Sequence, residues 1–228
     1  MPTSTWDRLP APRRDAVLAA AEAEFGAQGF SRGSLNVIAR EAGVSKGSLF
    51  QYFADKGDLC AYLADIVCLR IRADLELHIP GLPWATDFFE AMRRFGHVWV
   101  RYYAAHPVEL ALTVAANLEM DPAARSAVRT VVNRHYIEVL RPMVEEGRRS
   151  GQLDADADVD AFLALLMLVF PHLVIAARNP DLDALLGLGG GTVADGQQAV
   201  DRLVEVFRTG LAPRRSAGRA APAVAAGA

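Results

Sequence analysis

The stretch SLNVIAREAGVSKGSLFQYF, residues 34–53, carries the most specific local signals in this chain of 228 residues. Ser34 and Ser45 are residue types that cap helix N-termini, and each stands before a short run with apolar residues at helical spacing. Gly43 lies between the two runs, where a chain that leaves a helix takes a positive backbone angle. The spacing predicts two short helices joined by a tight turn, which is a helix-turn-helix.

The second predicted helix has an apolar side and a polar side. Lys46, Ser48 and Gln51 lie on the polar side, and a helix that only fills a core has little structural reason to expose them together. The small residues at its start, Ser45 and Gly47, let backbone amides approach phosphates. A glutamine can also pair with a base edge, adenine by preference. A pair of purely structural helices remains the alternative, but the polar side favours DNA binding.

Composition and charge permit a DNA-binding protein but not one that is basic throughout. Hydrophobic residues make up 52% of the chain, which suits a sizeable core, and the formal net charge is −3. Residues 1–57 carry seven basic and six acidic residues, so this part has a net charge of +1 and the remainder has −4. A small positive region on an acidic protein is compatible with DNA contacts made by a few placed groups.

Motifs of several other protein classes are missing from the sequence. Cys60 and Cys68 would lie about 12 Å apart along one helix, too far to form a disulfide, and no Cys/His spacing of a zinc site is present. We therefore expect no metal and no cofactor. Without a Ser-His-Asp elbow, a phosphate-binding loop or paired carboxylates, we expect no enzyme. The N-terminus also lacks the pattern of a signal peptide, which favours a cytoplasmic location.

Residues 161–177, AFLALLMLVFPHLVIAA, form an uncharged run that is close to the length of a membrane span. Pro171 and His172 interrupt the run, no second span exists, and the flanks lack a basic cluster. A helix that is buried on nearly all sides in a large interface has the same composition. We therefore expect no membrane segment here.

The remaining pattern predicts an all-α protein of about nine helices. Helical spacing, turn glycines and prolines place helices near residues 13–28, in the helix-turn-helix pair, from 55 to beyond 71, and near 84–106, 107–118, 121–150, 156–178 and 194–210. The Pro-rich residues 1–12 and the Ala/Pro/Arg-rich residues 212–228 are expected to be a disordered arm and a disordered tail.

Residues 36–59, NVIAREAGVSKGSLFQYFADKGDL, resemble the signature of the tetracycline-repressor (TetR) family of bacterial transcription regulators. Close resemblance covers about residues 13–66, and beyond these only the number and order of helices match. Phe50 departs from the family pattern, which usually has a tyrosine there, and so lacks a hydroxyl that could touch a phosphate. The resemblance implies a DNA-binding head over residues 13–57 and an effector-binding and dimerisation domain over residues 58–211.

The resemblance also implies roles for individual residues and for partners. The expected DNA-binding residues are Ser34, Ser45, Lys46, Gly47, Ser48, Phe50, Gln51, Tyr52 and Lys56. Of these, Lys46, Ser48 and Gln51 would lie nearest the bases, whereas Ser34, Tyr52 and Lys56 would hold phosphates. A homodimer formed through the helices near 156–178 and 194–210 would read a near-palindromic operator on double-stranded DNA. A small-molecule effector would release it.

An aromatic stripe on the predicted helix 84–106 suggests where such an effector binds. The candidate ligand-binding residues are Phe88, Met92, Phe95, Trp99, Tyr102, Tyr103, His106, Asn117, His135 and His172. Aromatic stripes of this kind usually fill a core, and that alternative stays open for each residue. The functional interpretation is an apolar cavity with few polar groups, which suits an apolar or aromatic effector. A helical ligand-binding or partner-docking module without DNA binding is the alternative function.

Overall fold

The computed structural model describes residues 2–212, and this part of the chain is all-helical, as predicted. Its α-helices are α1 (Ser4–Asp7), α2 (Ala11–Gln28), α3 (Leu35–Glu41), α4 (Lys46–Tyr52), α5 (Lys56–Leu75), α6 (Phe88–Ala105), α7 (Pro107–Asn117), α8 (Pro122–Arg149), α9 (Val159–Ile175) and α10 (Val193–Leu211). Three short 3₁₀ helices, η1 (Ile79–Gly81), η2 (Pro180–Leu182) and η3 (Leu188–Gly190), lie in the connections. The predicted disordered tail falls outside the described residues except for Ala212, which ends α10.

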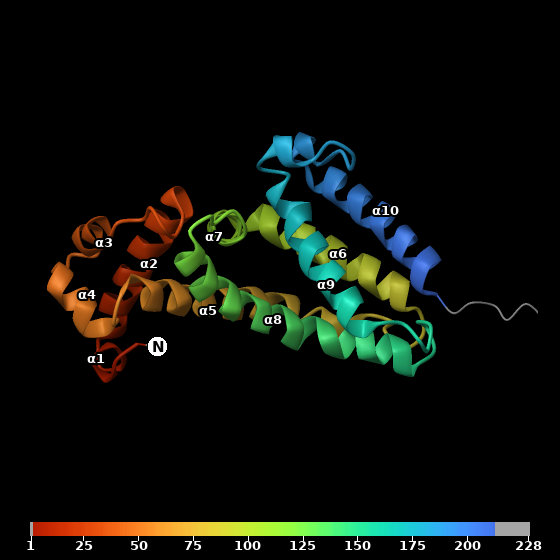
Figure 1. Ribbon diagram of the computed structural model, residues 1–228, viewed down its shortest axis with the longest axis horizontal. Coiled ribbons are helices and arrows are strands. Elements are labelled where there is room, and N and C mark those ends of the chain that lie inside the picture. The colour runs from red at the N-terminus through yellow and green to blue at the C-terminus, as the bar shows by residue number, and fades with distance from the viewer. Residues whose placement is uncertain (1, 213–228) are drawn as a thin grey trace, which may run out of the picture.

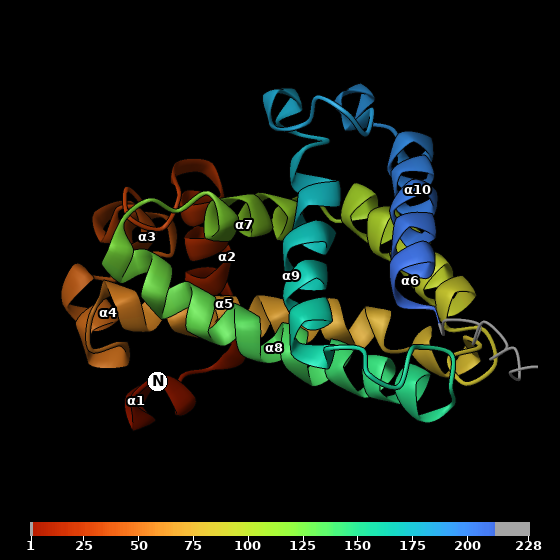
Figure 2. The same ribbon diagram turned by 45° about the vertical axis from the view of Figure 1, so that its right-hand side comes forward.

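The helices divide into a small head and a larger body (Figure 1). The head, α1–α4, lies at one end of the molecule, and α5 leads from it into the body. There α5 packs along α8, and α6 packs along α10 at the far end. Helix α9 crosses the body and contacts α8 as well as α6 and α10 (Figure 2). Because α5 contacts α2 of the head as well as α6, α7 and α8 of the body, it connects the two parts.

The N-terminal arm differs from the disorder that was expected. Residues 4–7 form α1, which accounts for the one helix beyond the predicted nine. The reason is Trp6, which is only 1% exposed and packs into the head against residues about fifty positions later in the chain. Burial of an aromatic side chain stabilises a segment that its local sequence alone would leave unstructured.

Helices α6 and α10 approach each other closely through two glycine–valine contacts. A Cβ atom added at Gly96 would come within 2.6 Å of the Val200 side chain, and one added at Gly196 within 2.7 Å of the Val100 side chain. Each valine therefore occupies space that only a glycine on the facing helix leaves open. This reciprocal packing fixes how α6 and α10 cross.

The apolar helix α9 buries one side and exposes the other. Phe162, Leu166 and Phe170 are buried, whereas Leu165 is 48% and Leu168 is 70% exposed. Within residues 2–212, no helix has both the length and the apolar character needed to cross a membrane. The exposed leucines thus form an apolar surface that the rest of the described chain leaves uncovered.

Candidate nucleic-acid interface and internal cavity

Helices α3 and α4 form the predicted helix-turn-helix, and the predicted caps are present. The Ser34 hydroxyl accepts a hydrogen bond from the Val37 amide at 3.5 Å, and the Ser45 hydroxyl accepts one from the Ser48 amide at 3.0 Å. Gly43 has a φ of 65°, in the left-handed region that favours glycine. The caps satisfy amides that have no partner within their own helix, and so they fix where each short helix begins.

One side of α4 faces solvent and carries most of the residues expected at DNA. Lys46, Gly47 and Gln51 are exposed, and Phe50 is 48% exposed. Lys46 and Gly47 follow the exposed Ser45 at the start of the helix, where backbone amides point outward. An ammonium group, an amide side chain and a glycine backbone on one surface can meet phosphates and base edges without disturbing the core.

Three other expected DNA contacts are engaged within the head. The Lys56 ammonium group donates to the Ser31 carbonyl at 2.7 Å. Tyr52 is only 4% exposed, because its ring packs on Trp6 with 5.8 Å between ring centroids. Ser34 is half-buried, and its hydroxyl caps α3. The side chains of Tyr52 and Lys56 thus join one part of the head to another, and their expected phosphate contacts stay a prediction.

A cavity of about 70 Å³ lies inside the body, between α5, α6, α7, α8 and α9. The Trp99 ring is part of its wall and lies 5.0, 5.7 and 5.4 Å from the ring centroids of Tyr103, Tyr136 and Phe170. The Trp99 indole N–H donates to the Phe170 carbonyl at 3.0 Å. Because this donor is already satisfied, the tryptophan presents only apolar surface to the cavity.

The cavity contacts half of the residues predicted to line it. Those in the wall are Phe95, Trp99, Tyr103, Asn117 and His135, and those elsewhere are Phe88, Met92, Tyr102, His106 and His172. Not all of the aromatic stripe on α6 lines the cavity, because this helix is about 27 Å long at 1.5 Å per residue and meets different neighbours along its length. On α6, only Phe95, Trp99 and Tyr103 line the cavity.

The residues outside the wall have other packing partners. Phe88 lies 6.3 Å from the Phe162 ring, near the start of α9, and Met92 faces the contact between α6, α9 and α10. Tyr102 and His106 stack on each other with 4.0 Å between ring centroids. His172 is half-buried and lies seven residues beyond Leu165, on the same exposed side of α9. For these five residues the core-filling or surface alternative describes the structure better.

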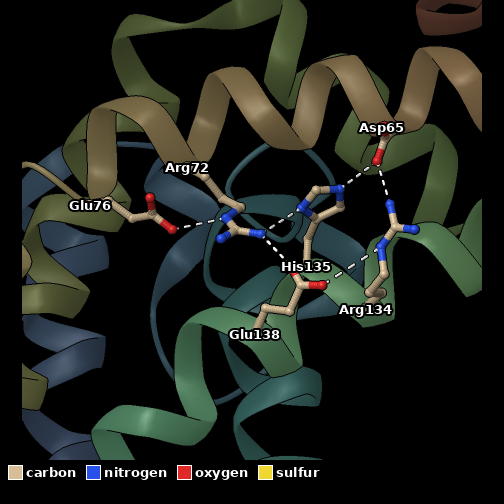
Figure 3. Close-up of polar contacts among 6 residues, drawn as sticks. All are labelled: Asp65, Arg72, Glu76, Arg134, His135 and Glu138. Atoms are coloured by element: carbon tan, nitrogen blue, oxygen red, sulfur yellow. Dashed lines mark hydrogen bonds and ion pairs between the residues drawn. The ribbon is translucent and has the colours of Figure 1, made fainter.

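Charged side chains from α5 and α8 form a network at one side of the cavity, centred on His135 (Figure 3). His135 Nε2 donates to Asp65 at 2.7 Å, whereas Nδ1 accepts from the Arg72 guanidinium at 3.1 Å, because a guanidinium group can only donate. The network also includes ion pairs of Arg72 with Glu76 and Glu138, and of Arg134 with Asp65. The charges in the wall are therefore already paired within the protein.

The other titratable groups of the wall stay uncharged at neutral pH. Burial raises the pKa of the Cys68 thiol to about 12. Burial likewise raises the pKa values of the Tyr103 and Tyr136 phenols above their usual range. A wall of aliphatic and aromatic groups, neutral hydroxyls and paired charges can hold a neutral apolar molecule but has no free charge for an ionic one.

Part of the wall was not assigned from the sequence. Leu63, Val67 and Ile71 on α5 line the cavity, and so do Tyr136 on α8 and Phe170 on α9. The apolar stripe of α5 was visible at helical spacing, and it could have identified the first three. Nothing in the local pattern could show that α5 and α6 would face each other across an open space.

The cavity also reaches the head. Phe30, in the turn between α2 and α3, contributes to the wall and is only 1% exposed. Its ring packs on Phe25 of α2 with 5.4 Å between ring centroids. A molecule in the cavity would therefore contact a residue that is four positions before the Ser34 cap of the helix-turn-helix.

Comparison with known proteins agrees with this arrangement. The model of the family "Bacterial regulatory proteins, tetR family" matches residues 17–63. The chain is 23% identical over 174 residues to the HTH-type transcriptional regulator YhgD of Bacillus subtilis, over 75% of this chain and 88% of that protein. It is 26% identical over 161 residues to the HTH-type transcriptional repressor NicS of Pseudomonas putida, over 69% of this chain and 74% of that protein.

A solved structure extends the likeness to nearly the whole fold. The crystal structure of the transcriptional regulator FadR from Bacillus subtilis, in complex with stearoyl-CoA, matches with a TM-score of 0.67 and 18% sequence identity. The match covers 83% of this chain and 97% of that one. At this level of identity the likeness concerns the fold.

Proposed function

The chain is a member of the TetR family of transcriptional regulators, and on this premise we propose that it is a homodimeric repressor that a small apolar or aromatic effector releases from a near-palindromic operator. Residues 13–57, together with α1, serve as the DNA-binding head, and residues 58–211 serve effector binding and dimerisation. The observation that carries the proposal is the presence in one chain of a helix with an exposed polar side, α4, and an internal apolar cavity that reaches the head.

In this proposal α4 enters the major groove and reads the operator. Lys46, Ser48 and Gln51 lie nearest the bases, and Ser45 and Gly47 bring backbone amides to the phosphates. Exposure of Lys46 and Gln51 on the same helix supports this assignment. Lys46 supplies charge that acts on any sequence, whereas Gln51 supplies a side-chain amide that can discriminate adenine.

Dimerisation would use α9 and α10, which correspond to the predicted segments 156–178 and 194–210. The exposed side of α9 supports this, because Leu165 and Leu168 leave an apolar surface that a second copy would cover. On α10, Val206 is 64% exposed and extends the apolar surface available for such a contact. A two-fold dimer places its α4 helices to read half-sites about 34–36 Å apart.

The effector would occupy the cavity beside Trp99 and Phe30. A volume of about 70 Å³ is small for a ligand site, so the effector is either compact or moves side chains as it enters. FadR was solved with stearoyl-CoA. In this chain the paired charges of Arg72 and Glu76 favour a neutral molecule over a carboxylate.

A gel-shift titration with the DNA upstream of the protein's own gene tests the proposal, followed by a footprint on any shifted fragment. The expected result is a protected region with two-fold symmetry, which neutral aromatic compounds weaken. Failure to shift this DNA or any duplex from a random pool would contradict DNA binding and favour a ligand-binding or docking module. A shift that no compound in a broad apolar library weakens would contradict the effector only.

A further inference from the structure

The N-terminal residues 3–6 contact the end of α4, the helix that carries the exposed polar surface. Trp6 is 1% exposed and lies in a cluster of aromatic rings, with centroid distances of 5.8 Å to Tyr52, 4.9 Å to Phe53 and 5.6 Å to Tyr62. Its indole N–H donates to the Tyr62 hydroxyl at 3.0 Å. One side chain therefore joins α1 to the end of α4 and to α5.

Thr3 completes the hydrogen bonding of α4. The last carbonyl groups of a helix have no partner within it, and in α4 two of them are satisfied by one residue. The Thr3 hydroxyl donates to the Gln51 carbonyl at 2.6 Å, and the Thr3 amide donates to the Tyr52 carbonyl at 2.9 Å. Because α4 has only seven residues, its stability depends on such outside contacts more than that of a long helix.

The other end of α1 is fastened to α2. The Arg14 guanidinium group donates to the Asp7 carbonyl at 3.0 Å and to the Leu9 carbonyl at 3.1 Å. The arm is therefore held at both ends, by α2 on one side and by the end of α4 on the other. Because residues 3–7 are held by α2 as well as by α4, they limit how far α4 can tilt relative to the rest of the head.

We propose that Thr3 and Trp6 are positioning residues for DNA recognition, which hold α4 at the angle at which its polar side meets the base edges. This inference rests on the proposed role of α4 in reading DNA. Residues 2–7, PTSTWD, contain no lysine or arginine side chain that could attract phosphates. Their contacts with the end of α4 act instead on the orientation of that helix.

The test measures binding of Thr3→Val to the footprinted operator and to a random duplex, by fluorescence anisotropy over a series of salt concentrations. This substitution keeps the shape of the side chain and removes the donor to Gln51. We expect a two- to tenfold loss, roughly, in operator affinity, with little change on the random duplex. The slope of affinity against salt should stay unchanged, because no phosphate contact is lost.

Thr5→Val is the matched control, because it makes the same change two residues away on a half-buried side chain. Trp6→Phe provides a second variant, which keeps an aromatic ring and removes the indole donor to Tyr62. It should lower operator affinity in the same direction while the thermal unfolding midpoint stays within a few degrees of the wild type, roughly.

Equal affinities of Thr3→Val and Thr5→Val for the operator would overturn the inference alone. Equal losses on operator and random duplex would also overturn it, since they would assign Thr3 to the folding of the head. If the wild-type protein itself showed no preference for any duplex, the proposed role of α4 would fail together with this inference.

Discussion

The Glu119 carboxylate accepts a hydrogen bond from the Ser31 backbone amide at 2.9 Å. Glu119 lies between α7 and α8 in the body, whereas Ser31 lies between α2 and α3 in the head, so this contact joins the two parts directly. The same carboxylate accepts from the Asp121 amide at 2.9 Å. Because Ser31 follows Phe30 of the cavity wall, the body holds the head at the point where the cavity reaches it.

The acid sensitivity of the protein should reflect this contact. Burial alone would raise the pKa of Glu119, which is 7% exposed, but hydrogen bonds from Ser31 and the amide of Asp121 outweigh burial and lower it. A carboxylate with a lowered pKa stabilises the folded state above its ordinary pKa of 4.5, and this stabilisation is lost as the pH falls through the folded value. Glu119→Gln should therefore unfold more easily at pH 7, by about 1–3 kcal/mol, and lose less stability on acidification.

Thermal melts between pH 7 and pH 3 check this prediction. Glu205→Gln, on the exposed side of α10, is the control and should follow the wild-type curve closely. If the difference between wild type and Glu119→Gln stayed constant over the whole pH range, the carboxylate would not be the group responsible.

Two substitutions on α4 should weaken DNA binding in different ways. Lys46→Ala removes an exposed cation, so we expect weaker binding to every duplex and a salt slope that is smaller by about 1. Gln51→Ala removes an amide, so we expect a relaxed preference at one base position, by about 1–3 kcal/mol. Titrations on the operator, on single-base variants and on a random duplex measure both effects. Equal losses for Gln51→Ala on specific and random DNA would rule out its role as a reader.

Local signals explain why the head could be predicted closely and the cavity only in part. Ser34, Gly43 and Ser45 act within one or two turns of their own position, so their roles can be inferred from the neighbouring residues. Trp6 acts through rings about fifty positions away, and the four residues of α1 are too few to show a helical periodicity. Phe30 is similar, because its place in the cavity wall depends on how the head meets the body.

The crossing of α6 and α10 should depend on the size of one residue. Gly96→Ala places a methyl group where the Val200 side chain already lies, 2.6 Å from the new Cβ atom, so we expect destabilisation of about 1–3 kcal/mol. Gly210→Ala is the control, because no atom lies within 4 Å of its added Cβ. Chemical denaturation measures both free energies of unfolding. A second substitution, Val200→Ala, should recover part of the loss by removing the clash.

The oligomeric state should respond to the exposed side of α9. Leu168→Asp places a charge on a side chain that is 70% exposed in the single chain and that the proposed dimer would bury. Burying an unpaired carboxylate is costly, so we expect a shift from dimer to monomer in sedimentation experiments, with the helical content unchanged. Leu185→Asp, at a leucine that is 82% exposed outside α9, should leave the dimer intact. Dimers of unchanged stability in Leu168→Asp would place the interface elsewhere.

A larger side chain in the cavity should raise the stability of the protein and abolish its response to the effector. Ala116 on α7 lines the cavity, whereas the neighbouring Ala115 is buried but does not. Ala116→Leu adds apolar atoms to open space, so we expect the free energy of unfolding to rise by up to about 1–2 kcal/mol. Ala115→Leu should lower it by about 1–3 kcal/mol through overpacking.

The Ala116→Leu protein should also keep its operator affinity while a compound that releases the wild-type protein no longer acts. If that compound released both proteins at the same concentration, the effector would bind outside this cavity.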